Sequence, residues 1–167
     1  MAPVPTGIEP ADMVDMLALL DDLIAFDTVA LTPNLDLIHY VQERLEALGA
    51  SVVLTHHADG TRANLFATIG PDVSGGIVLS GHSDVVPVDP ADWTTPPFEA
   101  HRRDGRIYGR GTADMKGFIA CVLAMTPTFA DLDLIVPIHV ALTFDEEDGF
   151  HGAPVLLADL VERGVRP

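Results

Sequence analysis

The chain has 167 residues, of which 48% are apolar and 20% charged, and these proportions indicate a globular protein with a sizeable core rather than a disordered chain. Its formal net charge of −16 argues against anionic partners, so we expect binding neither to nucleic acid nor to a membrane surface. The segment Met1–Pro10 lacks the pattern of a secretory signal, and no apolar run has the length of a membrane helix. The single cysteine, Cys121, precludes an internal disulfide and is expected in the core, and a cytoplasmic location is the default.

Hydrophobic periodicity and turn residues predict helices that alternate with short strands, which indicates a layered α/β domain. The run over 76–80 has the composition of a buried central strand, and Pro127 is expected to end the helix that precedes it. The predicted elements, in chain order, are helices over 11–26 and 34–48, strands over 51–55, 63–69 and 76–80, a hairpin over 98–108, a helix over 116–125, a strand over 136–144 and a helix over 153–163.

Three polar clusters, each directly after a predicted strand or the hairpin, contain the residues with catalytic potential. They are Gly81–Asp84, Gly109–Gly117 and Asp145–Gly149. Ligand sites in α/β sheets gather outside the carboxyl ends of the strands, so clusters that are far apart in the sequence can converge there.

The first cluster contains His82 and Asp84, which point to the same side if the segment is extended. A metal-binding imidazole usually donates its other ring nitrogen to a carboxylate or a carbonyl, and Asp84 can supply that carboxylate if the chain bends back. The competing interpretation is a polar strand end with an ordinary hydrogen-bonded histidine.

The second cluster places Asp114 among glycines, whose permissive backbone allows a carboxylate to reach into a cleft and bridge two cations. The competing interpretation is that Asp114 caps the following helix. Lys116, the only lysine, is expected on the surface of the first helical turn.

The third cluster contains the adjacent Glu146 and Glu147, which point in different directions at a strand end. One can bind a cation while the other faces a substrate, and repulsion with partial burial would raise one pKa, as a general base requires. A charged, solvated turn is the alternative interpretation.

Together the clusters provide an imidazole and several carboxylates, the ligand set of zinc, cobalt or manganese hydrolytic sites. Two such cations about 3.5–4 Å apart can activate one water molecule and polarise one carbonyl. The remaining histidines have no partner pattern and are interpreted as structural or surface residues: His39, His56, His57, His101, His139 and His151.

Three stretches resemble, in order along the chain, the signatures of the acetylornithine deacetylase family of M20-type metallohydrolases: Leu79–Pro87, Tyr108–Ala120 and Thr143–Glu147. Trp93 and Pro97-Phe98 are similar to the segment between the first two signatures. The resemblance implies a layered, zinc-exopeptidase-like α/β catalytic domain with a mixed central sheet flanked by helices.

The resemblance also implies a role for each candidate residue. His82 would bind one metal ion, Glu147 the second, and Asp114 both, with a cis peptide bond after Asp114. Glu146 would be the general base, and Asp84 the partner of His82. The implied cofactors are two divalent metal ions, zinc foremost, with cobalt or manganese as alternatives.

The implied reaction is hydrolysis of the amide bond of a small N-acyl amino acid, most simply N2-acetylornithine to ornithine and acetate in arginine biosynthesis. Succinyl-diaminopimelate desuccinylases and metallocarboxypeptidases are related alternatives, and the complete enzyme is expected to be a homodimer.

The family takes a further carboxylate ligand, a histidine ligand and a lid and dimerisation domain from segments that would follow Pro167. We therefore expect residues 1–167 to be the N-terminal part of the catalytic domain, incomplete at its C-terminal side and inactive alone. The alternative is a truncated, non-catalytic chain that binds a cation loosely.

Overall fold

The computed structural model describes residues 10–167, so the interpretation of residues 1–9 lies outside the described part of the chain. None of the helices within residues 10–167 has the length and apolarity to span a membrane. The elements, in chain order, are α1 (Pro10–Ala25), α2 (Leu35–Ala47), β1 (Ser51–His56), β2 (Ala63–Ile69), β3 (Ile77–His82), the 3-10 helix η1 (Pro90–Asp92), β4 (His101–Arg103), β5 (Arg106–Tyr108), α3 (Lys116–Asp131), β6 (Ile138–Thr143) and α4 (Gly152–Glu162).

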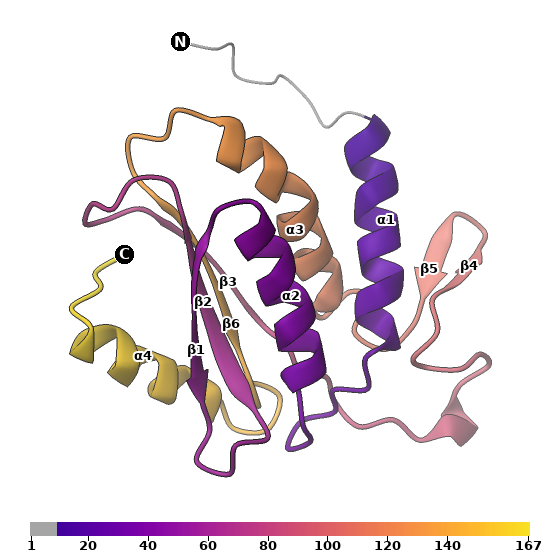
Figure 1. Cartoon of the computed structure of the whole chain (residues 1–167). Helices are drawn as coiled ribbons and strands as arrows, with labels where there is room; N and C mark the ends of the chain where they lie inside the picture. Colours follow the sequence, from indigo (N-terminus) through magenta and orange to yellow (C-terminus); the bar gives the residue numbers. More distant parts are fainter. Residues whose placement is uncertain (1–9) are drawn as a thin grey trace.

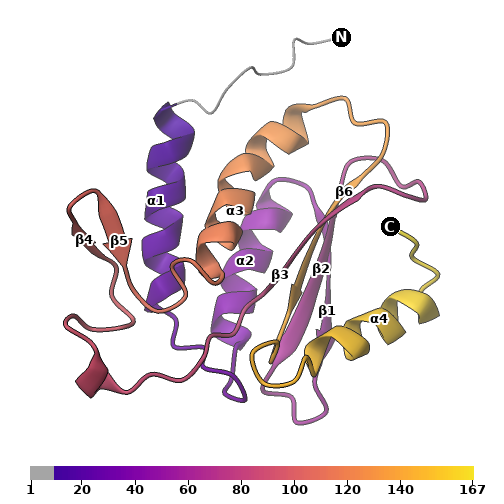
Figure 2. The same cartoon turned by 180° about the vertical axis from the view of Figure 1, so that it is seen from behind.

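Four of the strands form a mixed sheet in the order β1-β2-β6-β3. The β1–β2 and β2–β6 pairs are antiparallel, whereas β3 and β6 are parallel. Helices α1, α2 and α3 cover one face of the sheet and α4 covers the other (Figures 1 and 2). The prediction of a layered α/β domain with a mixed sheet flanked by helices is therefore confirmed.

Strand β2 shows why the sheet is covered on both faces. Leu65 and Ala67 point into the core beneath α1, α2 and α3, whereas Phe66 between them packs with Leu156 and Leu160 of α4. Successive side chains of a strand point to opposite faces, so a strand with apolar side chains on both faces needs a cover on each side. The apolar residues on the two faces of β2 thus account for the helices on both faces of the sheet.

Strand β3 is an edge strand, so its prediction as a buried central strand was wrong. It pairs with β6 alone among the described strands, and the side chains of Ile77 and Val78 are 58% and 38% exposed. An apolar run indicates that its side chains favour burial, but it does not indicate how many strands pair with the strand that it forms.

The free edge of β3 predicts that the 167-residue chain self-associates when salt screens its charge. Unpaired backbone groups and exposed apolar side chains favour pairing between copies, whereas a net charge of −16 opposes it. We expect sedimentation velocity to show association at physiological ionic strength, where the screening length is about 8 Å, and less association at low salt. The variant Ile77→Lys should associate less, and a chain that stays monomeric at both salt concentrations would contradict the prediction.

Helix α3 continues past Pro127 to Asp131, so the prediction that Pro127 ends the helix was wrong. A proline removes one helical hydrogen bond and crowds the preceding turn. The hydroxyl of Thr126 donates to the carbonyl oxygen of Val122 at 2.9 Å, which gives that turn a polar contact. The packing of α3 against α1 and the sheet outweighs the local cost of the proline. Cys121, expected in the core, lies on the exposed side of the same helix.

Candidate metal centre

The parallel pairing of β3 with β6 brings two of the three polar clusters together. His82, the last residue of β3, lies opposite Thr143, the last residue of β6. The backbone amide of Ser83 then donates to the carbonyl oxygen of Thr143 at 2.8 Å. The residues that follow each strand therefore leave the same edge of the sheet side by side, as expected for the carboxyl ends of parallel strands.

The loop before α3 adds the third cluster. The amide of His82 donates to the Met115 sulfur at 3.2 Å, and a side chain at Gly81 would press against Met115. Met115 therefore packs against the end of β3 and brings its neighbour Asp114 to His82. The Asp114–Met115 peptide bond is cis, as the family resemblance implied. Met115, not Asp114, is the N-cap residue of α3, and no side chain caps the helix.

His82, Asp114 and Glu147 form the donor cluster. Each offers one ligand atom, and these three atoms lie within 4.8 Å of one another. His82 Nε2 is 3.1 Å from a carboxylate oxygen of Asp114 and 3.7 Å from one of Glu146. Ligand distances of about 2.0–2.2 Å are typical of zinc bound by histidine and carboxylates. The spacing and chemistry of the cluster fit a divalent cation, with Glu146 at its edge.

Asp84 orients two parts of the cluster with different groups. Its backbone carbonyl oxygen lies 2.9 Å from His82 Nδ1, which leaves Nε2 facing Asp114. Its carboxylate is 3.6 Å from Nδ1 and accepts the backbone amides of Glu146 and Glu147 at 3.1 and 3.0 Å. The sequence predicted that the Asp84 carboxylate would be the partner of His82; the backbone carbonyl takes the hydrogen-bond position instead, and the carboxylate holds the glutamate backbone.

The electrostatics of the cluster reflect burial and close carboxylates. Burial alone would lower the pKa of His82, but hydrogen bonds to Asp84 and Asp114 outweigh it and raise the pKa to about 9. Burial would raise the pKa of Asp84, yet His82 and the two glutamate amides bring it below its usual value. Burial raises the pKa of Glu147. An imidazole binds a metal only when it is neutral, so a cation held at this cluster would have to displace a proton from His82.

Lys116 is fully buried, which corrects its prediction as a surface residue. Its ammonium group donates to the carbonyl oxygen of Phe26 at 2.6 Å, just after the end of α1. Burial lowers the pKa of Lys116 to about 8, although the nearby carboxylate of Asp27 acts in the opposite direction. The carbonyl end of a helix carries partial negative charge and suits a cation. Lys116 therefore joins the start of α3, next to Asp114, to the end of α1.

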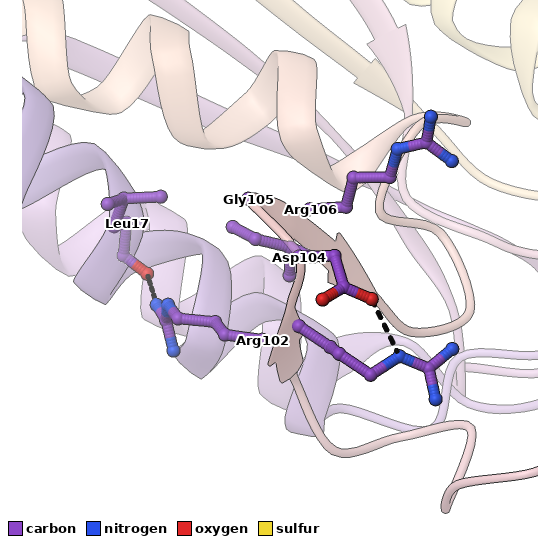
Figure 3. Close-up of a pocket in the computed structure, with 7 residues that line it drawn as sticks. Leu17, Arg102, Asp104, Gly105 and Arg106 are labelled. Atoms are coloured by element: carbon purple, nitrogen blue, oxygen red, sulfur yellow. Dashed lines mark hydrogen bonds and ion pairs between the residues drawn. The ribbon is translucent and has the colours of Figure 1, made fainter.

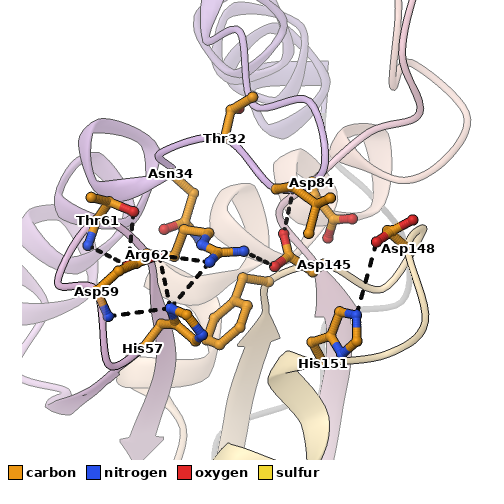
Figure 4. Close-up of polar contacts among 12 residues, drawn as sticks. Thr32, Asn34, His57, Asp59, Thr61, Arg62, Asp84, Asp145, Asp148 and His151 are labelled. Atoms are coloured by element: carbon orange, nitrogen blue, oxygen red, sulfur yellow. Dashed lines mark hydrogen bonds and ion pairs between the residues drawn. The ribbon is translucent and has the colours of Figure 1, made fainter.

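Sequence reasoning missed Asp145 and Arg62, which form a buried ion pair beside the cluster (Figure 4). Asp145 was predicted as a member of the third cluster and signature but was given no role of its own, and Arg62 is 83 residues away in the sequence. The interpretation of the other histidines is consistent with the structure. His139 is buried and bonded to Thr68, and the exposed His151 lies 3.8 Å from Asp148.

A cavity of about 300 Å³ adjoins Asp114. Its lining includes Trp93, Tyr108, Arg110 and Thr112, which come from the segment between the first two signatures and from the glycine-rich loop. A second cavity, of about 360 Å³, lies between α1 and the β4–β5 hairpin and contains none of the predicted site residues (Figure 3). Of these two cavities, the one that contains Asp114 lies where a small molecule would be beside the donor cluster.

The fold is similar to part of several solved peptidase structures. Human carnosine dipeptidase 1 matches 92% of this chain with a TM-score of 0.79 at 24% identity, although the match covers 36% of that chain. An M20 family metallo-carboxypeptidase from Sulfolobus solfataricus matches 89% of this chain with a TM-score of 0.77 at 24% identity, and the match covers 35% of that chain.

The chain belongs to peptidase family M20/M25/M40, whose model matches residues 78–167, more than half of its length. An acetylornithine deacetylase from Myxococcus xanthus is 43% identical over 145 residues, which cover 84% of this chain and 37% of that protein. The resemblance seen in the signatures is thereby confirmed. The chain spans 31% to 41% of the length of the curated relatives that it matches.

Proposed function

We propose that this chain supplies the N-terminal part of the catalytic domain of a metal-dependent amidohydrolase. The observation that carries the proposal is the convergence of His82, Asp114 and Glu147 at the carboxyl ends of β3 and β6, with Glu146 beside them. The proposed substrate is an N-acyl amino acid, and N2-acetylornithine is the foremost candidate because the matched relatives include acetylornithine deacetylases. The remaining ligands and a lid and dimerisation domain would come from the rest of the complete protein, a cytoplasmic homodimer.

The proposed cofactors are two divalent ions, with zinc preferred and cobalt or manganese as alternatives. His82 would hold one ion, Glu147 the other, and Asp114 both. Bound at this position, such cations polarise a substrate carbonyl and lower the pKa of a water molecule. The backbone carbonyl of Asp84 lies against His82 Nδ1, which would leave Nε2 available to hold an ion.

Glu146 is the proposed general base. Its carboxylate takes a proton from the attacking water while the water oxygen bonds to the acyl carbon. The carbon–nitrogen bond then breaks as Glu146 returns the proton to the leaving amine, which gives a free amino acid and a carboxylic acid such as acetic acid, which then loses its proton to the surrounding water. The cavity lined by Trp93, Tyr108 and Arg110 lies on the Asp114 side of the cluster, where it can hold the rest of the substrate.

Zinc binding to the 167-residue chain is expected to depend on His82. The substitution His82→Ala removes the only nitrogen donor of the cluster and should weaken zinc binding at least about 10-fold, because metal affinity follows the number and geometry of ligands. Isothermal titration calorimetry measures the affinity. His151→Ala is the matched control, since it removes an exposed histidine that also lies near a carboxylate. Equal affinities of the two variants would contradict the proposed site.

The same titration separates the enzyme from the alternative of a non-catalytic chain. A chain that binds zinc weakly, with no dependence on His82, fits the alternative. The complete protein then tests the substrate class: rapid release of acetate from N2-acetylornithine supports the deacetylase, whereas preferential cleavage of unmodified dipeptides supports a peptidase.

A further inference from the structure

Asp145 is a buried carboxylate immediately before the two glutamates, and its side chain is tied to two distant segments. It is only 1% exposed. One carboxylate oxygen accepts the backbone amide of Leu31 at 2.8 Å, and the other accepts a guanidinium N–H of Arg62. Figure 4 shows Asp145 between Arg62 on one side and Asp84 on the other. Asp145 therefore joins the end of β6 to the loop after α1 and to the turn before β2.

Arg62 is itself held in place from several directions. Its side chain is 10% exposed, and it donates to Asp59 at 2.7 Å and lies 3.1 Å from His57 Nδ1. Its guanidinium also lies 5.6 Å from the centre of the Phe144 ring. Removing one partner of a buried ion pair leaves an uncompensated charge, so Arg62 and Asp145 hold each other firmly. The partner of Asp145, Arg62, is thus itself held by several contacts and is not a freely moving surface residue.

The backbone at Asp145 turns in a way that separates its side chain from those of the glutamates. Its φ is +50°, a left-handed conformation that most residues avoid and that aspartate and asparagine tolerate better. Directly after this turn, the amides of Glu146 and Glu147 donate to the carboxylate of Asp84. The segment is therefore held on one side by the Asp145 side chain and on the other by Asp84.

We propose that Asp145 is a positioning residue for Glu146 and Glu147. Its contacts with Arg62 and Leu31 hold the left-handed turn, and the turn directs both glutamates to the donor cluster. Asp145 binds neither metal nor substrate in this proposal, because its carboxylate is fully engaged with Arg62 and Leu31. The effect of Asp145 on metal binding rests on the proposed metal site. Whether Asp145 holds the backbone of Glu146 and Glu147 in place can be measured without metal.

Amide hydrogen exchange of the metal-free chain tests whether Asp145 holds the two glutamates, because exchange measures local opening residue by residue. The variant Asp145→Gly keeps the left-handed backbone accessible but removes the tether. Asp145→Asn keeps one oxygen acceptor and tolerates the same backbone conformation. Asp148→Asn is the matched control, because it removes the charge of an exposed aspartate from the same acidic run.

We expect exchange at the amides of Glu146 and Glu147 to accelerate at least about 10-fold in Asp145→Gly, while the amides of β6 keep their protection. Asp145→Asn should restore part of the protection, and Asp148→Asn should leave it unchanged. Unchanged exchange at both glutamates in Asp145→Gly would overturn the proposal. So would equal acceleration throughout β6, because that pattern describes general loss of stability.

Zinc titration provides the functional measurement. Where the variants are folded, Asp145→Gly should weaken zinc binding about 10-fold or more, as loss of a group that orients a ligand typically does, and Asp145→Asn should weaken it less. Equal zinc affinity of Asp145→Gly and the unaltered chain would overturn the positioning role. If Asp145→Gly does not fold, Asp145→Asn and Arg62→Lys replace it in the exchange and zinc measurements. Both should then show faster exchange at Glu146 and Glu147 and weaker zinc binding than the unaltered chain.

The design also keeps this inference apart from the proposed function. If His82→Ala leaves zinc affinity unchanged, the metal site itself is refuted. The exchange pattern at Glu146 and Glu147 still shows whether Asp145 holds them.

Discussion

The substitution Glu146→Gln is expected to lower the turnover of the complete protein by about 10²- to 10⁴-fold, the usual contribution of a general base. The amide has nearly the shape of the acid but cannot take the proton from water. Metal binding should persist, because Glu146 lies at the edge of the donor cluster and the three ligand atoms come from other residues. Steady-state kinetics with N2-acetylornithine and the metal content of the purified protein together measure the two effects.

Glu147→Gln is the matched control for this experiment, since it makes the same chemical change one residue later. We expect it to lose metal as well as activity, because it weakens a proposed ligand. The opposite pattern, with metal lost in Glu146→Gln and retained in Glu147→Gln, would show that the roles of the two glutamates are exchanged.

The substitution Gly117→Ala is expected to disrupt both stability and metal binding. A Cβ at this position would collide with the carbonyl oxygen of Thr112, which is backbone and cannot rotate away. The loop between these residues contains Asp114, so relief of the collision must move the proposed bridging ligand. Overpacking of this kind typically costs about 1–3 kcal/mol. Denaturant unfolding and zinc titration measure the two losses.

Gly60→Ala is the comparison for Gly117→Ala. Gly60 has a φ of +72° and no neighbouring atom within 4 Å of the added Cβ, so only the backbone conformation opposes the substitution. We expect a cost of about 1 kcal/mol with unchanged zinc affinity. If both variants bind zinc equally well, the close approach of Gly117 to Thr112 does not position Asp114.

Most of the secondary structure could be predicted because it depends on patterns within the chain. The apolar periodicity of α2 and the bounds of β2 follow directly from local sequence. The convergence of His82 with Glu147 also had a local basis, since His82 ends one strand, Glu147 follows another, and parallel strands end at one edge of a sheet.

The features that escaped prediction depend on partners distant in sequence. The burial of Lys116 requires the carbonyl of Phe26, and the burial of Asp145 requires Arg62. A charged residue is ordinarily solvated, and the residues next to it in the sequence do not indicate whether it has a partner far away in the chain. The edge position of β3 escaped prediction for the same reason, because the composition of a strand does not indicate which strands pair with it.

The donor cluster belongs to a single supersecondary unit. Strand β3 ends at His82, Asp114 lies just before the crossover helix α3, and Glu147 follows the parallel strand β6. During synthesis His82, Asp114 and Glu147 therefore leave the ribosome in the order in which β3, α3 and β6 are made. Strands β1 and β2 have left it before them. New termini introduced by circular permutation between β1 and β2 would leave this order unbroken. The segments that hold the turn before Glu147, around Leu31 and Arg62, also precede this crossover in the chain, so every described contact that positions the donors can form as soon as β6 is in place.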